Sequence, residues 1–374
     1  MRCGVCLSAM NYTAWEAFDE TDASGRWVAP PIPDHQIVRE DLTLGVLADR
    51  LGFDSLWTVE HRASPYNMVT SPLQWLTYFA GATSRIDFGT MVIVLPWHHP
   101  VRVAEDITML HNILGDERRL TVGVGRGAGR REFGALDIPM GESRERFLEG
   151  LEIVRGLLSN EVFSHEGQHY RVPRMSLRPR PRDGRQLAEN IYCAWGSPQT
   201  VPIAADAGLK PLVIALKSWT EYAQDLEQFQ ALRSDKGLPP VKPIVAFTLY
   251  CNRDEEQARA GAERYFGDYT DAAIRSYELY SPHFGQTKGY ESYAQADGGA
   301  PDRAALEAGM LKTWVENHVW GTPEMCLARI REINDMISPS EIIVLPRIGS
   351  MGLEVATESL SLFAEQVLPA VRDL

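Results

Sequence analysis

Short apolar runs alternate with helical segments along nearly the whole chain, and this alternation restricts the possible folds more than any other feature. Most of the runs are almost continuously apolar, which indicates strands buried on both faces, as in a parallel sheet. Eight strand–helix units favour an α/β fold of the closed (β/α)8 type, the TIM barrel, over an open, doubly wound sheet. The expected strands cover residues 2–9, 55–60, 86–95, 119–125, 190–195, 210–216, 242–251 and 341–346.

The segments between these runs carry signals for the start and end of helices. Ser71 followed by Pro72 is a suitable N-cap and first helical residue, and Ser143 can cap the helix after the fourth strand. After Pro100, apolar residues recur with a helical period until Gly115. The expected helices cover 36–51, a segment that starts at Pro72, 100–114, 143–158 and about 354–368.

One segment, 267–320, is too long to be a single connection within a barrel. Its glycines include those at positions 285, 289, 298 and 299. We therefore predict a single barrel domain over residues 1–374, with a partly mobile insertion at 267–320, near the seventh strand.

The composition argues against several classes of partner. The formal net charge of −13 is unfavourable for binding nucleic acid or an anionic membrane, because a polyanion would be repelled. The chain has no signal-peptide pattern and no apolar run of about 18 residues, so we expect no membrane segment. Its five cysteines are odd in number and scattered, which is typical of reduced thiols. We expect a cytoplasmic protein.

The glycine-rich run Gly123–Ala128 matches the G-x-G-x-x-A pattern of a dinucleotide fold, but it follows the fourth strand rather than the first. Arg126 leaves the end of this strand, and Arg144 begins the following helix. Both therefore flank one loop on the same face of a barrel. Two guanidinium groups beside a helix N-terminus would suit a monophosphate. The alternative is surface salt bridging to Glu132, Glu142 or Glu145.

Histidines follow two of the expected strands. Glu60, His61 and Arg62 lie just past the second strand, at the end of a barrel where catalytic residues gather. A histidine there can transfer protons near neutral pH, so His61 is a candidate catalytic residue, and the alternative is a hydrogen-bonded rim histidine. One residue of the pair His98–His99 could line a pocket, or both could pack where the helix begins at Pro100.

The stretch Trp195–Ser197 ends the fifth strand and precedes a helix. Gly196 and Ser197 can offer amide and hydroxyl donors to the same phosphate. Ordinary helix capping by Ser197, with Pro198 as the first helical residue, is the alternative, and the two interpretations are compatible.

Two patterns that suggest metal binding are better explained otherwise. His165–His169 reads H-E-G-Q-H, but a zinc site would need a helix, whereas Gly167 and the flanking residues favour a hairpin. Cys3 and Cys6 lie three apart on a strand and point to opposite faces, which favours core packing. We predict no metal ligands, and a zinc-dependent barrel hydrolase is the weakest alternative.

Several motifs resemble the bacterial luciferase family of flavin-dependent monooxygenases. "IVLPWHHPVRVAEDITMLHNI" is similar to the third-strand segment of that family, and "ERRLTVGVGRGAGRREF" is similar to its next strand and turn. "LGFDSLWTVEHR" resembles its second strand, which ends in Glu-His. The segments "ESRERF", "HVWGTPEMCLARI" and "QTKGYESY" have counterparts in the right order. The resemblance extends over nearly the whole chain.

This resemblance implies a barrel that binds reduced FMN at its C-terminal face. The two arginines that hold the FMN phosphate correspond to Arg126 and Arg144, and the active-site histidine corresponds to His61. A non-proline cis peptide beneath the flavin ring corresponds to Met91–Val92. Together with the residues after the fifth strand, the expected cofactor-binding residues are Met91, Val92, Arg126, Arg144, Trp195, Gly196 and Ser197. The expected substrate-binding residues are Glu60, Trp97 and His99.

Two departures from luciferase mean that light emission is not implied. Luciferase has a cysteine just before the first phosphate-binding arginine, where this chain has Gly125. It also has a Glu-Ser pair after the fifth strand, where this chain has Trp195–Gly196. A tryptophan at that position suggests a different substrate wall or a surface on which a ring can stack.

The resemblance implies a two-component monooxygenase that acts with a separate NAD(P)H:flavin reductase. Oxygen would add at flavin C4a to give a (hydro)peroxide, which attacks an aldehyde or ketone or oxygenates another small substrate. His61 would donate or accept a proton, and the insertion at 267–320 would act as a lid. A homodimer is expected. The alternatives are a deazaflavin (F420)-dependent hydride-transfer enzyme, whose relatives commonly carry an acid near the glycine turn, and a non-catalytic flavin-binding protein.

Overall fold

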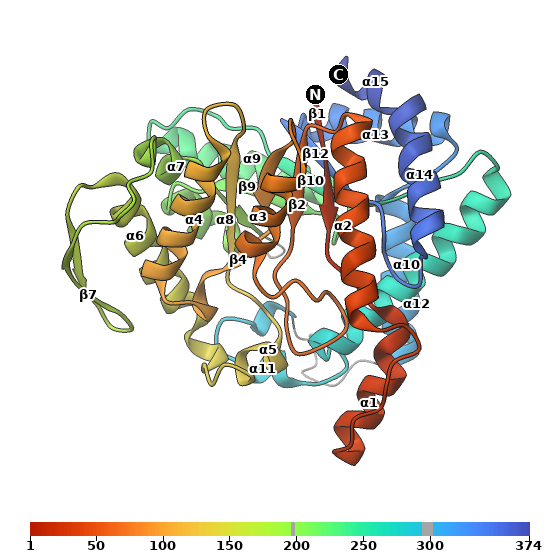
Figure 1. The fold of residues 1–374 in the computed structure, drawn as a ribbon, viewed down its shortest axis with the longest axis horizontal. Coiled ribbons are helices and arrows are strands. Elements are labelled where there is room, and N and C mark those ends of the chain that lie inside the picture. Colours follow the sequence, from red (N-terminus) through yellow and green to blue (C-terminus); the bar gives the residue numbers. More distant parts are fainter. Residues whose placement is uncertain (196–198, 294–301) are drawn as a thin grey trace.

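The computed structural model describes residues 1–195, 199–293 and 302–374, and its centre is a closed ring of parallel strands (Figure 1). Each strand pairs with its neighbour around the ring, and β10 pairs with both β9 and β12, which closes it. The ring positions are β1 (Arg2–Leu7), β2 (Ser55–Thr58), β3 (Asp87–Thr90) with β4 (Ile93–Val94), β5 (Leu120–Gly125), β8 (Ile191–Ala194), β9 (Lys210–Ile214), β10 (Ile244–Cys251) and β12 (Glu341–Leu345). The predicted eight-stranded barrel is confirmed.

Helices surround the ring, and most of them return the chain to the start of the next strand (Figure 1). The longer helices are α2 (Asp34–Leu51), α3 (Pro72–Ala82), α4 (Pro100–Leu114), α6 (Ser143–Ser159), α9 (Trp219–Asp235), α10 (Glu255–Tyr277), α12 (Arg303–Asn317), α13 (Pro323–Ile337) and α14 (Leu353–Gln366). The shorter ones are α1 (Trp15–Ser24), α5 (Arg130–Gly134), α7 (Gly184–Glu189), α8 (Thr200–Asp206), α11 (His283–Gln286) and α15 (Leu368–Arg372). Single 3-10 turns cover Tyr12–Ala14, Leu95–Trp97, Met140–Glu142 and Glu291–Tyr293.

Four details differ from the sequence-based expectations. The expected strand 86–95 is divided into β3 and β4 around a cis peptide bond at Met91–Val92. Ser143 is the first residue inside α6 rather than its N-cap, which is Glu142. Helix α10 continues unbroken through position 267, so the part of 267–320 that lies outside a helix begins at Glu278. A short additional strand, β11 (Val319–Gly321), pairs with the end of β10 outside the ring.

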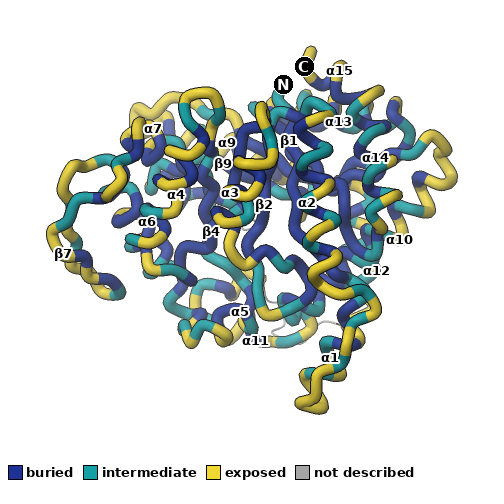
Figure 2. Tube along the Cα trace, viewed as in Figure 1, coloured by how far each residue is buried: buried dark blue, intermediate teal, exposed yellow. Residues whose placement is uncertain are grey.

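The strands at the centre of the ring, such as β1 and β2, are buried, whereas the tip of α1 is exposed (Figure 2). The hairpin expected at His165–His169 is confirmed, because β6 (Phe163–Glu166) and β7 (Arg171–Met175) pair antiparallel. Cys3 and Cys6 are both buried and free, as expected for core residues.

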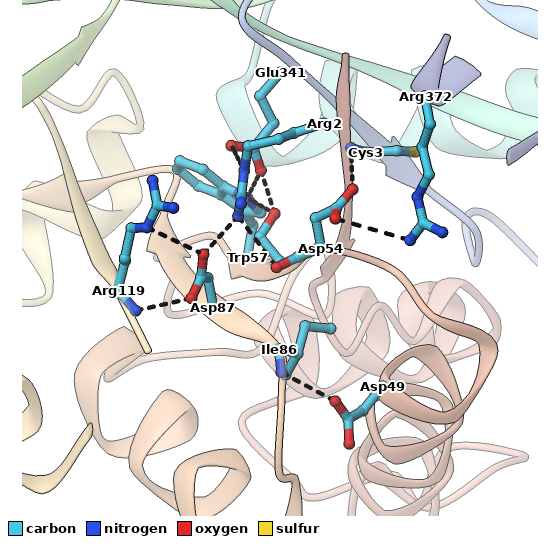
Figure 3. Close-up of polar contacts among 11 residues, drawn as sticks. Arg2, Cys3, Asp49, Asp54, Trp57, Ile86, Asp87, Arg119, Glu341 and Arg372 are labelled. Carbon is cyan, nitrogen blue, oxygen red and sulfur yellow. Dashed lines mark hydrogen bonds and ion pairs between the residues drawn. The ribbon is translucent and has the colours of Figure 1, made fainter. Parts of the chain in front are cut away.

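A network of paired charges fills the end of the barrel at which the strands begin (Figure 3). The Arg2 guanidinium donates to Asp87 at 2.7 Å and to Glu341 at 3.4 Å. Trp57 lies inside the ring and donates from its indole nitrogen to Ser55 Oγ at 2.7 Å. Burial raises the pKa of the Glu341 carboxyl, while Arg2 opposes that rise. Every charged group in this network has a partner of opposite sign, so this end of the barrel has a structural role.

The indole of Trp57 fits because its neighbours on β1 and β3 are Gly4 and Gly89. A Cβ atom at Gly89 would lie 2.3 Å from Trp57 Cδ2, far inside van der Waals contact. We expect Gly89→Ala to lower the free energy of unfolding by about 1–3 kcal/mol, because the indole cannot move away within a filled barrel. Urea titration followed by circular dichroism measures the change.

The matched control is Gly81→Ala in α3, where a Cβ atom would have no neighbour within 4 Å. This variant should be neutral or gain about 0.5–1 kcal/mol, because glycine disfavours a helix interior. Equal stabilities of the two variants would contradict the role given to Trp57.

His318, next to β11, supplies a second measurable property of the core. Its Nδ1 accepts the backbone N–H of Thr248 at 2.7 Å, and its Nε2 donates to the Ala215 carbonyl at 2.9 Å. Burial lowers the pKa of His318 from 6.5 to about 3, so the folded state holds a neutral ring. The unfolded chain therefore binds a proton that the folded chain does not between these two pH values.

The stabilisation from neutral His318 is complete above pH 6.5 and is lost as the pH falls toward about 3. Between pH 6.5 and 4 this group alone can remove up to about 3 kcal/mol of stability. We expect His318→Gln, which can keep both hydrogen bonds, to show a smaller difference between urea midpoints at pH 7 and pH 4 than the wild type. The same pH dependence in both proteins would contradict this explanation.

Candidate active site

The sequence-predicted site residues come from loops at the carboxyl ends of the barrel strands, in the lower half of Figure 1. The loops after β2, β4 and β5 meet there, and a segment between α10 and α12 lies across them. We call residues 278–293 the covering segment. In Figure 1, α5 and α11 mark where the covering segment meets the loop after β5.

Arg126 and Arg144 converge at this rim. Arg126 directly follows β5, and Arg144 is the second residue of α6. A Cβ atom at Gly289 would lie 2.9 Å from Arg126 Nη1 and 3.8 Å from Arg144 Nε, so both guanidinium groups border one small space. Both side chains are half-buried, and neither has an ion pair with a described residue. Half-buried cations without carboxylate partners suit an anionic ligand.

The alternative partners of the two arginines are engaged elsewhere. The three glutamates considered for surface salt bridges each have a different partner: Glu132 contacts His61, Glu142 contacts Arg146, and Glu145 contacts Lys288. The structure therefore brings the two arginines together beside the N-terminus of α6, where neither forms an ion pair with a described carboxylate.

The covering segment contacts the arginine pair directly. Arg126 donates to the Gly289 carbonyl at 2.7 Å, and its guanidinium lies 3.9 Å from the centre of the Tyr290 ring. The Tyr290 hydroxyl donates to the Gly127 carbonyl at 2.6 Å and lies 2.9 Å from Ser143 Oγ. The ring of Tyr290 is fully buried, so this part of the covering segment packs into the rim.

Two ion pairs hold the remainder of the covering segment. Glu278 accepts from Arg130 at 2.7 Å, and Lys288 donates to Glu145 at 2.5 Å. Both pairs are partly exposed, which makes them weak enough to open.

His61 lies between the rim and the end of α10. Its Nδ1 is 2.9 Å from Glu132 Oε1, and its side chain is 14 % exposed. Tyr66 and Tyr277 contact the ring edge-on, with centroid distances of 5.0 and 5.9 Å. No described residue hydrogen-bonds to Nε2, so that nitrogen is available for a proton transfer.

Glu60 occupies a different environment, although it precedes His61. Its side chain is completely buried, with Oε1 accepting from Arg62 and His98, both at 2.6 Å. Its Oε2 accepts the Val94 backbone N–H at 2.8 Å. The carboxylate therefore anchors β4, and both of its oxygens already have donors. The assignment of Glu60 to substrate binding stays a prediction.

Trp97 and His99 lie apart from each other. Trp97 is buried under the guanidinium of Arg62, at 4.9 Å, and contacts the edge of Phe133. His99 is exposed and is the N-cap of α4. Its ring contacts that of Tyr170, which directly precedes β7 in the outer hairpin. The structure thus brings Trp97, but not His99, into the neighbourhood of His61.

The peptide bond Met91–Val92 is cis, as the resemblance implies. Val92 reaches toward β5, where a Cβ atom at Gly125 would lie 2.5 Å from Val92 Cγ2. This explains why position 125 is a glycine here: Val92 fills the volume that a cysteine side chain would need.

Of the residues expected after the fifth strand, only Trp195 lies within the described part of the chain. It is 2 % exposed, and its ring packs 5.0 Å from the centre of Phe229. Gly196 and Ser197 fall outside the described residues.

Sequence reasoning missed three side chains that shape the site: Glu132, Tyr277 and Tyr290. Glu132 carried a usable signal, because Gly129 lies three residues earlier and a glycine can leave room for a neighbouring side chain. Tyr277 and Tyr290 reach the rim from about 150 residues downstream. The segment QTKGYESY, which resembles the family, contains Tyr290 but predicted no role for it, and no local pattern predicts the contact of Tyr277.

Within residues 1–195, 199–293 and 302–374, no cluster of three or more acidic, histidine or cysteine side chains could hold a metal. The histidines of the H-E-G-Q-H stretch instead contact carboxylates: His165 contacts Glu149 of α6, and His169 contacts Glu142, the N-cap of α6. In the same ranges, no helix is both long and apolar enough to cross a membrane.

Comparison with known proteins extends these observations. Residues 19–338 match the model of the luciferase-like monooxygenase family. The chain is 26 % identical over 359 residues to the alkanal monooxygenase alpha chain of Photobacterium leiognathi, which covers 92 % of this chain and 96 % of that one.

Solved structures share the fold over nearly the full length. Monooxygenase RslO1 from Streptomyces bottropensis superimposes with a TM-score of 0.76 at 25 % identity, covering 99 % of both chains. The FMN complex of the oxygenating constituent of 3,6-diketocamphane monooxygenase from Pseudomonas putida gives 0.68 at 19 %, covering 99 % and 98 %. An F420-dependent secondary alcohol dehydrogenase gives 0.69 at 15 %, covering 100 % and 99 %.

The family model covers most of the chain, and solved structures share its barrel over nearly the full length. This chain belongs to the luciferase-like monooxygenase family.

Proposed function

We propose that the chain is the oxygenase component of a two-component monooxygenase that uses reduced FMN and O2. The observation that carries this proposal is the convergence of Arg126 and Arg144 on one space without carboxylate partners among the described residues. A flavin mononucleotide ends in a single phosphate, which matches two guanidinium groups and a helix N-terminus. The FMN complex of a structural neighbour supports the same cofactor.

When bound, reduced FMN supplies the electrons that activate O2, and the protein supplies position, dryness and proton transfer. The covering segment excludes water from the rim, and the free Nε2 of His61 moves a proton at the substrate. An aldehyde or a ketone is the proposed substrate, since relatives named as alkanal and diketocamphane monooxygenases act on carbonyl compounds.

We also propose that a separate NAD(P)H:flavin reductase delivers the reduced flavin. A homodimer is the proposed assembly, and exposed apolar side chains on the adjacent helices α3 and α4 support it. These side chains are Tyr78, Met109 and Ile113.

A product screen tests the proposed reaction. The chain is mixed with FMN, NADH, a flavin reductase and a panel of aldehydes and cyclic ketones under ¹⁸O2, and mass spectrometry detects one labelled oxygen in the product. A parallel binding titration with FMN and with F420 tests the second candidate, an F420-dependent hydride-transfer enzyme, which a structural neighbour favours. Tight binding of F420 together with no labelled product would favour that candidate.

The phosphate assignment predicts a selective loss of affinity. We expect Arg126→Ala and Arg144→Ala each to weaken FMN binding by about 10- to 100-fold, because each removes a charge-assisted contact to the phosphate. Riboflavin, which lacks the phosphate, should bind the variants and the wild type equally. Flavin fluorescence titration measures both affinities.

Arg171→Ala is the matched control, since Arg171 is 81 % exposed on the β6–β7 hairpin and away from the rim. It should leave FMN affinity unchanged. An equal loss of FMN and riboflavin affinity in the rim variants would indicate misfolding rather than a phosphate site and would contradict the assignment.

If the covering segment excludes water, loosening it should lower the fraction of NADH consumption that leads to oxygenated product. Replacing Arg130 and Lys288 together by alanine removes both ion pairs that hold the segment. We expect about two- to fivefold more H2O2 per NADH consumed, because water gains access to the rim. The double variant Lys236→Ala, Arg171→Ala removes two exposed ion pairs elsewhere and should leave coupling as in the wild type. Unchanged H2O2 release in the rim variant would show that the segment does not exclude water.

A further inference from the structure

Glu132 lies against the ring of His61, and its burial is unusual for a carboxylate. The residue is 1 % exposed, and its Oε1 lies 2.9 Å from His61 Nδ1 and accepts the Arg62 backbone N–H at 3.1 Å. Its Oε2 is buried without a hydrogen-bond partner among the described residues. An unpaired carboxylate oxygen in the interior costs stability, so stability alone does not explain an acid at this position.

The glycine turn makes room for this carboxylate. A Cβ atom at Gly129 would lie 2.1 Å from Glu132 Oε2 and 2.8 Å from Cδ. Any other residue at position 129 would therefore push the carboxylate away from His61. The backbone after β5 thus serves two purposes: it presents Arg126 at the rim, and it seats an acid beside the histidine.

Two tyrosines fix the orientation of the histidine ring. Tyr66 and Tyr277 contact the His61 ring at interplanar angles of 71° and 78°. Burial, followed by the nearby Glu132 carboxylate, raises the pKa of the Tyr277 phenol well above its usual range. Tyr277 therefore stays neutral, and the Glu132 carboxylate is the negative charge that faces Nδ1.

We propose that Glu132 is a positioning residue that keeps the proton of His61 on Nδ1 and leaves Nε2 as the nitrogen that exchanges a proton with the substrate. A carboxylate on one imidazole nitrogen fixes the tautomer in which the other nitrogen accepts. When Nε2 takes a proton, the imidazolium is balanced by ionised Glu132, and the proton returns from Nε2 in the reverse step. This role rests on the proposed function of His61.

The substitution Glu132→Gln distinguishes a residue that fixes the tautomer of His61 from one that only fills space. Glutamine has the shape of glutamate, but its amide can turn its NH2 group toward Nδ1. Nδ1 would then accept, and the ring proton would move to Nε2, which removes the acceptor that the reaction needs. A residue that only filled space would tolerate the same change.

The first readout is the tautomer of His61 in protein labelled with ¹⁵N-histidine, measured at pH 8 without cofactor. Loss of one signal set in His61→Gln assigns the resonances. We expect a protonated Nδ1 and an unprotonated Nε2 in the wild type and the opposite pattern in Glu132→Gln. Glu149→Gln is the matched control, because Glu149 forms a similar pair with His165, at 3.2 Å, on the outer hairpin. It should change the His165 signals and leave those of His61 unaltered.

The second readout is steady-state turnover of the carbonyl substrate that the labelled-oxygen screen returns. We expect Glu132→Gln to lower kcat by about 10²-fold or more, with KM and FMN affinity within about twofold of the wild type. Glu132→Asp, which keeps the charge, should recover part of kcat, and Glu149→Gln should retain all of it.

A wild-type His61 protonated on Nε2, or full kcat in Glu132→Gln, would overturn the proposal. The wild-type tautomer is decisive even if a variant does not fold. The two proposals can fail separately. Absence of any oxygenated product would reject the proposed function. The ¹⁵N spectrum would still show which nitrogen of His61 carries the proton, because that measurement needs no turnover.

Discussion

The backbone turn after β5 is the constraint on which the rim of this barrel depends. The last residue of β5 and two residues of the turn are glycines, and a neighbouring side chain fills the place that each missing Cβ would take. Val92 packs at Gly125, Val94 at Gly127, and Glu132 at Gly129, with distances of 2.5, 2.8 and 2.1 Å to the respective Cβ positions. Gly127 also has a φ of +76°, which disfavours other residues. The run that looks like a dinucleotide fingerprint therefore serves close packing between β4, β5 and α5.

Charges are organised in opposite ways at the two ends of the barrel. Where the strands begin, Arg2, Asp87 and Glu341 neutralise one another (Figure 3). Where they end, Arg126 and Arg144 meet without carboxylate partners in the described part of the chain. Charges that already have partners of opposite sign stabilise the fold but gain little from a ligand. Two neighbouring cations without carboxylate partners are stabilised when an anion binds between them. This contrast gives a structural role to the paired end and supports the proposal that the other end binds an anion, within a protein whose net charge is −13.

The sequence predicted the parts of the structure that local patterns encode. Buried strands are readable as continuous apolar runs, and the helix that starts at Pro100 is readable from its period and from Gly115. The cis peptide at Met91–Val92 was expected only from the resemblance, because sequence spacing gives no sign of such a bond, and the division of the third strand around it was not expected. Ser143 has a hydroxyl suited to capping, yet it lies inside α6, where it contacts the Tyr290 hydroxyl instead. The local sequence thus indicated that Ser143 lies at the start of this helix, but its contact with Tyr290, 147 positions away, could not be predicted from a local pattern.

Neighbouring residues also explain the two departures from luciferase. A cysteine at position 125 would collide with Val92, so this chain replaces a thiol beside the cis peptide with an apolar contact. Trp195 is buried against Phe229, so its ring acts as a fixed wall rather than as an open stacking surface. Apolar contacts occupy both positions, while Arg126, Arg144 and His61 stand where the resemblance places them. Under the proposed function, flavin binding and proton transfer would depend on these three residues, and substrate selection on the walls, where this chain differs.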